Sequence, residues 1–256
     1  MSLFSFCPLY FKNDLYHVLT NKLSNELSLI LCVLVAIVIP YLLGSLNFGI
    51  IISKLFYHDD IRNYGSGNAG STNMLRTYGK GMAALTLAGD MLKGALSVLV
   101  GALVLNPMAG TTIDGTYVTN TPVDGIAIAA LFVILGHIFP CFYRFKGGKG
   151  VATFGMVILV TRPLIFAVLL VIFVIVVAGT RFVSLGSIIG ALMFPILLNR
   201  LDTNYPMGWF TLASIVIGLL IVFMHRTNIK RLLAGKESKI SFGKKDKAPT
   251  ENGDKK

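Results

Sequence analysis

Charged residues and cysteines are both scarce in this chain, and each shortage excludes a class of protein. Charged side chains make up 14% of the 256 residues and hydrophobic ones 54%, with a mean hydropathy of +0.73. Soluble domains average about 25% charged residues, so the composition indicates an integral membrane protein. Cys7, Cys32 and Cys141 show no paired spacing and no neighbouring histidine cluster. We therefore expect no disulfide, no metal site and no cofactor.

Several functional signatures are also missing. No internal repeat is visible, which gives no support to an inverted-repeat transporter. Gly65–Gly70 formally matches the dinucleotide fingerprint G-x-G-x-x-G, but a membrane span precedes it instead of a strand. Gly147–Gly150 fails as a nucleotide-binding P-loop, because Tyr143 stands where the first glycine belongs. Nucleotide hydrolysis is therefore not expected.

Apolar stretches recur along the chain at the length that a membrane span needs, which is about 20 residues per helix. We expect an all-α, polytopic membrane protein with seven transmembrane helices, at 29–56, 81–105, 124–142, 150–161, 163–180, 184–199 and 207–224. Arg162-Pro163 divides one long apolar stretch, so a count of six remains if 150–161 is re-entrant. Residues 1–28 are interpreted as an uncleaved N-terminal extension, 29–225 as the membrane domain and 226–256 as a basic tail.

Loop charge predicts the orientation. Lys and Arg occur in 57–80, in 143–149 and in the tail, where ten basic residues face four acidic ones, whereas 106–123 contains none. The positive-inside rule then places the N-terminus outside and the C-terminus in the cytoplasm of a bacterium, across its inner membrane. The net charge of +11 is attributed to this tail and to anionic lipid, not to nucleic acid. The tail from Gly235 onward is expected to be disordered.

Two segments between spans have the composition of phosphate-binding loops. The first is Arg62–Asn73, followed by Arg76 one helical turn after Thr72, and the second is Arg144–Gly150. Glycine lets backbone N–H groups approach an anion, while Arg and Lys supply charge and hydroxyl or amide side chains supply donors. The alternative for the first is a polar interfacial loop with an aromatic and glycine turn. For the second, it is that Lys146 and Lys149 only anchor a helix among headgroups. The predicted orientation brings both to the cytoplasmic boundary, with the turn Gly179–Ser184 and the cluster His225–Asn228.

Asp90 and Lys93 are the deep charges of the predicted spans, about 15 Å along the second one by helical rise. As an i,i+3 pair they can neutralise each other, and a structural ion pair and a site-supporting role both remain open. A transporter or channel for a small phosphorylated anion is the competing function, but it needs polar residues along several spans. An inert lipid-binding scaffold would explain the tail but not the paired loops.

The motifs and their order resemble the bacterial acyl-phosphate-dependent glycerol-3-phosphate acyltransferases, the PlsY-type family. The resemblance rests on Gly44–Gly49, Asp60–Thr77, Gly136–Pro140, Phe145–Thr153 and His225–Arg231, and covers about residues 40 to 240. Ser71 replaces the small Ala often found there, which is a mild departure. The resemblance implies a seven-helix fold whose active site faces the cytoplasm. It also implies acyl transfer from a long-chain acyl phosphate to the sn-1 hydroxyl of glycerol 3-phosphate, giving lysophosphatidic acid and phosphate.

The site residues follow from the matched motifs. By the resemblance we expect a catalytic group of Ser66, Arg76, Lys149, His225 and Asn228. Substrate binding is expected at Gly67, Asn68, Thr72, Asn73, Lys146, Gly147, Gly148 and Ser184. The partners implied are glycerol 3-phosphate, acyl phosphate, membrane lipid and a soluble enzyme that produces acyl phosphate.

The expected chemistry needs placement more than a nucleophile. An acyl phosphate already carries a good leaving group, so no Ser or Cys is required to form an acyl-enzyme. The proton of the acceptor hydroxyl can pass to His225 or to the donor phosphate, and we favour the phosphate, with His225 mainly binding. No histidine is followed by Asp at the fifth position. The H-x4-D signature of soluble and monotopic glycerolipid acyltransferases is thus absent, which argues against acyl-CoA as donor.

Overall fold

Every regular element in the described residues, 25–105, 124–201 and 209–240 of this computed structural model, is a helix. The long helices are α2 (Asn25–Ser45), α5 (Lys80–Val104), α6 (Gly125–Ile138), α7 (Val151–Thr161), α8 (Pro163–Thr180), α9 (Val183–Leu201) and α10 (Trp209–Met224). The short ones are α3 (Phe48–Tyr57), α4 (Ser71–Tyr78) and α11 (Arg226–Leu233), with the 3-10 turns η2 (Ile61–Asn63) and η3 (Cys141–Tyr143). The predicted all-α class is therefore confirmed for this part of the chain.

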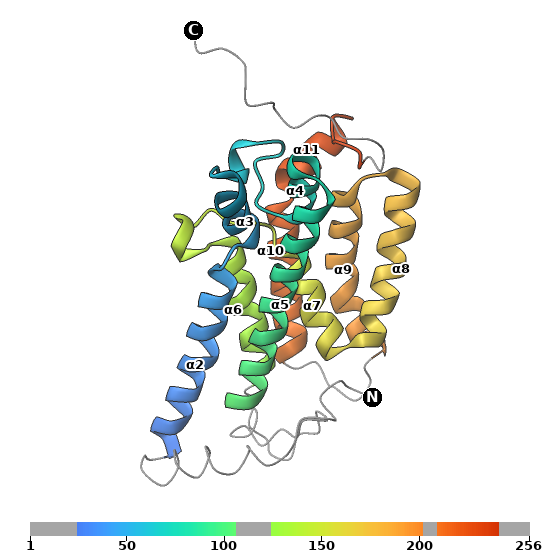
Figure 1. Cartoon of the computed structure of the whole chain (residues 1–256). Coiled ribbons are helices and arrows are strands. Elements are labelled where there is room, and N and C mark those ends of the chain that lie inside the picture. Colours follow the sequence, from blue (N-terminus) through green and yellow to red (C-terminus); the bar gives the residue numbers. More distant parts are fainter. Residues whose placement is uncertain (1–24, 106–123, 202–208, 241–256) are drawn as a thin grey trace.

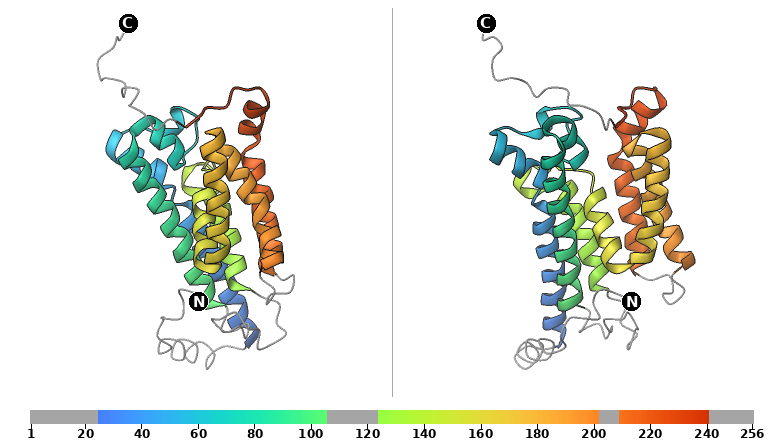
Figure 2. Two further views of the ribbon diagram at one scale, coloured as in Figure 1. Left: turned by 90° about the vertical axis from the view of Figure 1, so that its right-hand side faces the viewer. Right: turned by 45° about the vertical axis from the view of Figure 1, so that its right-hand side comes forward.

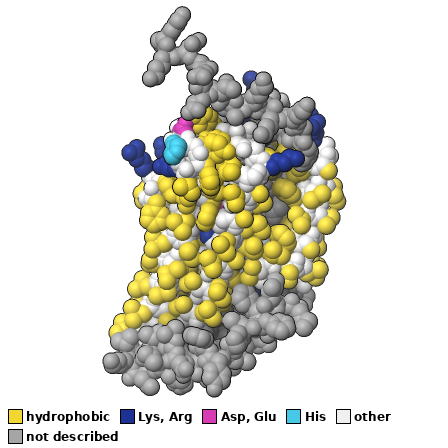
Figure 3. Space-filling model, viewed as in Figure 1, with side chains coloured by type: hydrophobic (Ala, Val, Ile, Leu, Met, Phe, Trp, Pro, Cys, Tyr) yellow, Lys and Arg dark blue, Asp and Glu magenta, His cyan; other side chains and the backbone are white. Residues whose placement is uncertain are grey.

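The long helices run side by side, and α3, α4 and α11 gather at one end of the bundle (Figures 1 and 2). We call this end the loop end and define it as residues 58–79, 139–150, 181–182 and 225–240. On the face shown in Figure 3, Lys and Arg side chains collect at the loop end, and hydrophobic side chains cover the flank. Such an apolar flank is typical of helices that face lipid.

Five segments are long and apolar enough to cross a membrane: 27–57, α5, 125–143, α8 and α9. A sixth is counted if α10 and α11, which meet at a bend of 55°, form one span. The apolar helix α7 is the shortest of the seven long helices, with 11 residues, a length of about 16 Å by helical rise against a hydrocarbon core of about 30 Å. It ends where the sequence predicted, because Pro163 begins the next helix at its first turn.

The first predicted span, 29–56, is broken between Ser45 and Phe48, a difference from the expected single helix. Lys93 donates its Nζ hydrogens to the carbonyls of Gly44 at 2.9 Å and Leu46 at 2.8 Å, and ion-pairs with Asp90 at 3.0 Å. The backbone N–H of Phe48, at the start of α3, faces the Asp90 carboxylate. A cation thus meets the C-terminal end of α2 and an anion the N-terminal end of α3, as helix dipoles favour.

The apolar core lies between α6, α7, α9 and α10. Its fully buried members include Val133 and Ile134 of α6, Val157 of α7, Phe194 of α9 and Ile217 of α10. Phe194 contacts the Phe154 ring edge to face, with centroids 5.2 Å apart. This core fixes α9 and α10 relative to α7; α7 and α9 carry residues of the cavity described below, and α10 leads directly into His225.

The segment after α11 is ordered as far as it is described, which differs from the expectation of disorder from Gly235 onward. The N–H of Ile240 donates to the Arg181 carbonyl at 2.8 Å. Glu237 accepts hydrogen bonds from Ser184 at 2.8 Å and from Arg231 at 2.7 Å. The hydrogen bonds to the Glu237 carboxylate hold this segment in place, although its composition by itself predicts disorder.

Candidate active site

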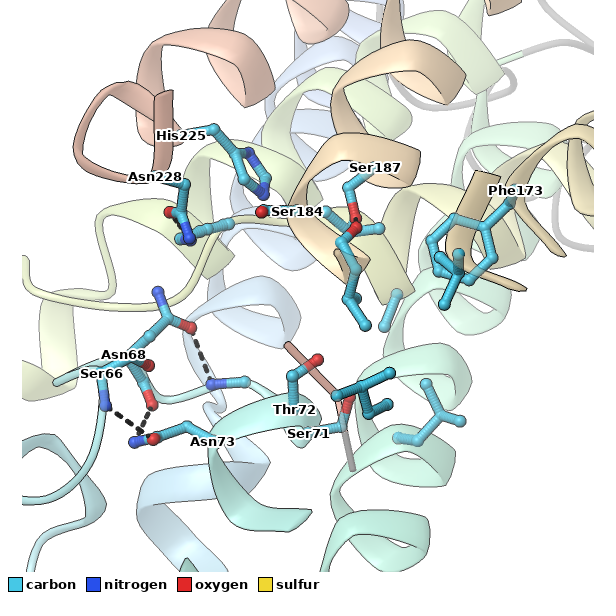
Figure 4. A pocket seen from close by; sticks show the side chains of 18 of the residues that line it. Ser66, Asn68, Ser71, Thr72, Asn73, Phe173, Ser184, Ser187, His225 and Asn228 are labelled. Carbon is cyan, nitrogen blue, oxygen red and sulfur yellow. Dashed lines mark hydrogen bonds between the residues drawn. The ribbon is translucent and has the colours of Figure 1, made fainter. Parts of the chain in front are cut away.

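A cavity of about 570 Å³ opens at the loop end. In Figure 4, Ser66, Asn68, Ser71, Thr72 and Asn73 lie on one side, and Ser184, Ser187, His225 and Asn228 lie on the other. The first group comes from the first glycine-rich segment and α4, and the second from α9, α11 and the residue before it. Phe173 of α8 lies at a third side. Polar residues far apart in the sequence thus converge here, as the predicted orientation required.

The first glycine-rich segment owes its shape to Asn73, which is 2% exposed. Its Nδ2 donates to the carbonyls of Ile61 at 3.2 Å, Tyr64 at 2.9 Å and Asn68 at 2.9 Å, and its Oδ1 accepts from the Ser66 N–H at 2.9 Å. Both polar atoms of the amide are therefore engaged within the segment. Asn73 lines the cavity, yet the contacts give it the role of shaping the loop.

The first turn of α4 also faces the cavity, through Ser71 and Thr72. The first N–H groups of a helix lack partners within it, and the positive end of the helix dipole favours an anion. Arg76 lies one turn further at the rim, where its Nη2 donates to the Ser238 carbonyl at 3.0 Å. This end of α4 thus combines backbone donors, hydroxyls and a guanidinium.

The second glycine-rich segment brings one charged side chain, Lys149, to the cavity. Lys149 donates to Asn228 Oδ1 through its Nζ. Burial, together with the charges of Arg231 and Arg76, lowers the pKa of Lys149 to about 8, against the attraction of Glu237. This ammonium is therefore partly desolvated beside other cations, so an incoming phosphate would be strongly attracted.

Four predicted residues do not line the cavity: Gly67, Lys146, Gly147 and Gly148. The Lys146 side chain is exposed. The N–H groups of Gly147 and Gly148 donate to the carbonyls of Ile138 and His137, each at 3.1 Å, at the C-terminal end of α6. These N–H groups are thus directed at α6 and not into the cavity, unlike the cradle that composition suggested.

His225 and Asn228 close the opposite wall and are 2% and 6% exposed. His225 Nδ1 lies 2.8 Å from the Ile221 carbonyl, which can only accept, so Nδ1 carries the proton and Nε2 is left for a ligand. Asn228 Nδ2 donates to Glu237 at 2.6 Å. Its amide is therefore oriented between Glu237 and Lys149.

Sequence reasoning missed Glu237. Although burial raises it, the pKa of Glu237 is lowered overall by hydrogen bonds from Arg231, Asn228 and Ser184. It lines the cavity and ties three elements together as a carboxylate. The available signal was its isolation, since it is the one acidic residue between Arg226 and Lys245.

Sequence reasoning also missed the apolar side of the cavity. The sequence of an apolar helix did not show which of its faces turns inward. The apolar side is formed by Leu87, Phe173, Val174, Val177 and Ala178. Asp90 and His137 also line the cavity, and their Oδ1 and Nδ1 atoms are 3.6 Å apart. The cavity therefore joins a cationic polar end to an apolar flank, a combination that suits an amphipathic anion.

Within the described residues, no serine that lines the cavity is hydrogen-bonded to a histidine. Ser184 donates to Glu237, and Ser187 donates to the Val183 carbonyl at 2.9 Å. Such a hydrogen bond to a base is what activates a serine for covalent catalysis. The arrangement instead offers binding, orientation and positive charge.

Comparisons with known proteins agree on one family. A family model described as glycerol-3-phosphate acyltransferase matches residues 34–235. A glycerol-3-phosphate acyltransferase of Thermoanaerobacter sp. (strain X514) is 43% identical over 203 residues, covering 79% of this chain and 93% of the relative. One of Neisseria meningitidis serogroup B (strain ATCC BAA-335 / MC58) is 38% identical over 205 residues, covering 80% and 96%.

Two crystal structures of PlsY (YgiH), an integral membrane glycerol 3-phosphate acyltransferase, have the same fold. The glycerol 3-phosphate form gives a TM-score of 0.71 at 34% identity, covering 82% of this chain and 96% of that one. The lysophosphatidic acid form gives 0.68 at 33% identity, covering 84% and 96%. Both matches extend over nearly the whole length of the solved protein.

Proposed function

This chain belongs to the glycerol-3-phosphate acyltransferase family, and we propose that it uses an acyl phosphate as donor and acylates the sn-1 hydroxyl of glycerol 3-phosphate. The products would be lysophosphatidic acid and inorganic phosphate, in phospholipid synthesis. The observation that carries the proposal is the double character of the cavity. Lys149 and Arg76 lie at its polar end and Phe173 and Val177 on its apolar flank, which matches an anionic headgroup joined to an acyl chain.

The proposed reaction needs no acyl-enzyme. The acceptor hydroxyl oxygen forms a bond to the acyl carbonyl carbon, and the bond from that carbon to the phosphate oxygen breaks. The hydroxyl proton passes to an oxygen of the donor phosphate, which leaves as inorganic phosphate. Holding two reactants in contact can supply about 7–11 kcal/mol of the barrier, and cations stabilise the charge that develops. Serines without a histidine partner are consistent with this direct transfer.

We assign the residues as two groups that hold two phosphates. Lys149, Ser66, Thr72 and the first turn of α4 would bind one phosphate. Arg76, Ser184, His225 and Asn228 would bind and orient the other substrate. His225, with its proton on Nδ1, would accept a hydrogen bond through Nε2, and the donor phosphate would serve as base. The acyl chain would lie along the apolar flank formed by α8.

We further propose seven spans, counting α7 and the broken first span once each, with the N-terminus outside. The loop end would then face the cytoplasm of a bacterium, at its inner membrane. The basic loops at this end support that orientation through the positive-inside rule. A soluble enzyme would supply the acyl phosphate at the membrane surface.

The test is phosphate release by the purified protein from palmitoyl phosphate, with and without glycerol 3-phosphate, and with palmitoyl-CoA as an alternative donor. Release that depends on glycerol 3-phosphate, with 1-acyl product and no reaction with palmitoyl-CoA, is expected. Lys149→Ala should abolish it and Lys146→Ala should retain it. If folded protein released no phosphate from either mixture, transport of a phosphorylated anion would become the leading function.

A further inference from the structure

Arg62 belongs to the first glycine-rich segment but does not line the cavity. Its Nη1 donates to the carbonyls of Lys146 at 2.7 Å and Tyr143 at 3.2 Å, which lie 84 and 81 residues away in the sequence. The composition of the first segment predicted that the charge of Arg62 would bind phosphate. The guanidinium is instead directed at the backbone carbonyls of Tyr143 and Lys146. Within the described residues, Arg62 alone forms hydrogen bonds between 58–79 and 139–150.

Asp60 fixes the direction of this guanidinium. Arg62 Nε lies 2.9 Å from Asp60 Oδ1, and Arg62 Nη2 lies 2.6 Å from Asp60 Oδ2, a two-point contact that sets the plane of the group. Asp60 Oδ1 also accepts from the Arg62 N–H at 3.0 Å and so caps η2. The pair is anchored at the base of the first segment before it reaches the second.

We propose that Asp60 and Arg62 form a latch that sets the spacing between the two phosphate-binding segments, with Arg62 acting as a positioning residue. The inference rests on the proposed function, because the latch matters only if both segments hold substrates. Lys149 lies three residues after Lys146, so a shift of the Lys146 carbonyl would move the Lys149 ammonium relative to α4. A displacement of about 1 Å can cost about 10²-fold in rate.

The latch predicts a particular split in the kinetics. After the latch is broken, Ser66, Thr72 and α4 still hold the phosphate that they share with Lys149, and the group around Arg76 still holds the other substrate. KM for each substrate should therefore change by less than about three-fold, while kcat should fall about 10- to 100-fold. Arg62→Lys should show the full loss, because an ammonium lacks the planar fork that contacts Asp60 and both carbonyls. Asp60→Asn should give a similar loss, and the double variant should be no worse than either single variant.

The kinetic experiment compares Arg62→Lys, Asp60→Asn and the double variant with the wild type, as full-length protein in vesicles. Arg200→Lys, at the far end of α9, is the matched control and should keep wild-type kcat. A wild-type kcat in Arg62→Lys would overturn the latch. The latch would also be overturned if Arg62→Lys raised KM for one substrate and Asp60→Asn did not, because that pattern identifies Arg62 as a phosphate ligand.

A second measurement keeps the latch testable if the protein transfers no acyl group. Spin labels at the exposed positions 63 and 146 report the separation of the two segments by electron–electron double resonance. Arg62→Lys should broaden the distance distribution, and Arg200→Lys should leave it unchanged. An unchanged distribution in Arg62→Lys would refute the latch whatever the activity. The background for labelling replaces Cys7, Cys32 and Cys141 with Ser.

Discussion

Asn73 holds the first glycine-rich segment from within, whereas the second segment is held by residues outside it. In the first segment, the side-chain amide of Asn73 is hydrogen-bonded to the backbone of Ser66 and Asn68. This segment presents several side chains to the cavity, among them Ser66 and Thr72. The second is hydrogen-bonded to the end of α6 and to Arg62 and presents a single cation, Lys149. One segment is a preformed set of donors, and the other is a support for one charge.

Gly67 of the first segment and Gly148 of the second have different tasks. Gly67 has a φ of +70°, a conformation that costs other residues about 1–2 kcal/mol. Gly148 has no such constraint, but a Cβ there would collide with the imidazole of His137. Gly67 thus serves to turn the chain, whereas Gly148 serves to bring the backbone close to α6.

Removing Lys149, the one charge that the second segment presents to the cavity, should have the largest effect. Lys149→Ala should lower kcat/KM for phosphate release by about 10²–10³-fold, because it deletes a buried cation from the site where charge develops. Lys146→Ala should stay within about two-fold, since that side chain is exposed. Equal losses in the two variants, measured with palmitoyl phosphate and glycerol 3-phosphate, would mean that the segment acts as a general basic surface.

Adding one methyl group should separate the two uses of glycine. Gly148→Ala should displace the second segment from His137 and reduce kcat by about 10²-fold, as expected for misplacement on the scale of 1 Å. Gly67→Ala should cost about 1–2 kcal/mol of local stability and only about three-fold in kcat. Steady-state rates and thermal unfolding of both variants test this order. The reverse order would contradict the division of roles.

Asn73→Ala should weaken the first segment by a smaller factor, about ten-fold in kcat/KM. It leaves buried carbonyls and the Ser66 N–H without their partner, at about 1–3 kcal/mol for each unsatisfied group. The melting temperature should fall as well. Asn63→Ala is the matched control, because Asn63 is exposed and donates one bond, to Asp59. A loss in Asn63→Ala as large as in Asn73→Ala would argue against the internal support.

The smallest effect concerns pH. The pKa of Lys149 is about 8, so its side chain is charged below that pH and neutral above it. For the substrate whose phosphate Lys149 binds, kcat/KM should therefore fall to about half its plateau value at pH 8. Glu237→Gln removes an attraction that raises this pKa, and should move the falling limb to lower pH. Lys149→Arg should move it to higher pH or abolish it. A limb that stays in place in both variants would belong to another group.

Much of the bundle was predictable from sequence because the length of the apolar runs indicates the helices and Pro163 marks one limit between them. Pro163 ended α7 and began α8 as expected. The break between Ser45 and Phe48 was not, because the apolar run 29–56 is continuous and the partner that stabilises the break, Lys93, lies on another helix. Contacts of this kind depend on packing, which no local pattern records.

The candidate site divides in the same way. Residue type together with the family resemblance named side chains that line the cavity, such as Lys149, His225 and Asn228. It did not show where the N–H groups of Gly147 and Gly148 point, since backbone direction is set by the end of α6. Glu237 was overlooked because its neighbours are basic and polar, and only the folded chain brings Ser184 to it.

The broken first span has a consequence for how the chain can enter a bilayer. The carbonyls of Gly44 and Leu46 lack helical partners at the break, and Asp90 and Lys93 would each be costly in hydrocarbon alone. Asp90 and Lys93 pair within α5, and Lys93 also supplies the donors that the Gly44 and Leu46 carbonyls lack. Segment 27–57 and α5 are energetically one unit, a helical hairpin whose two arms become stable in lipid together.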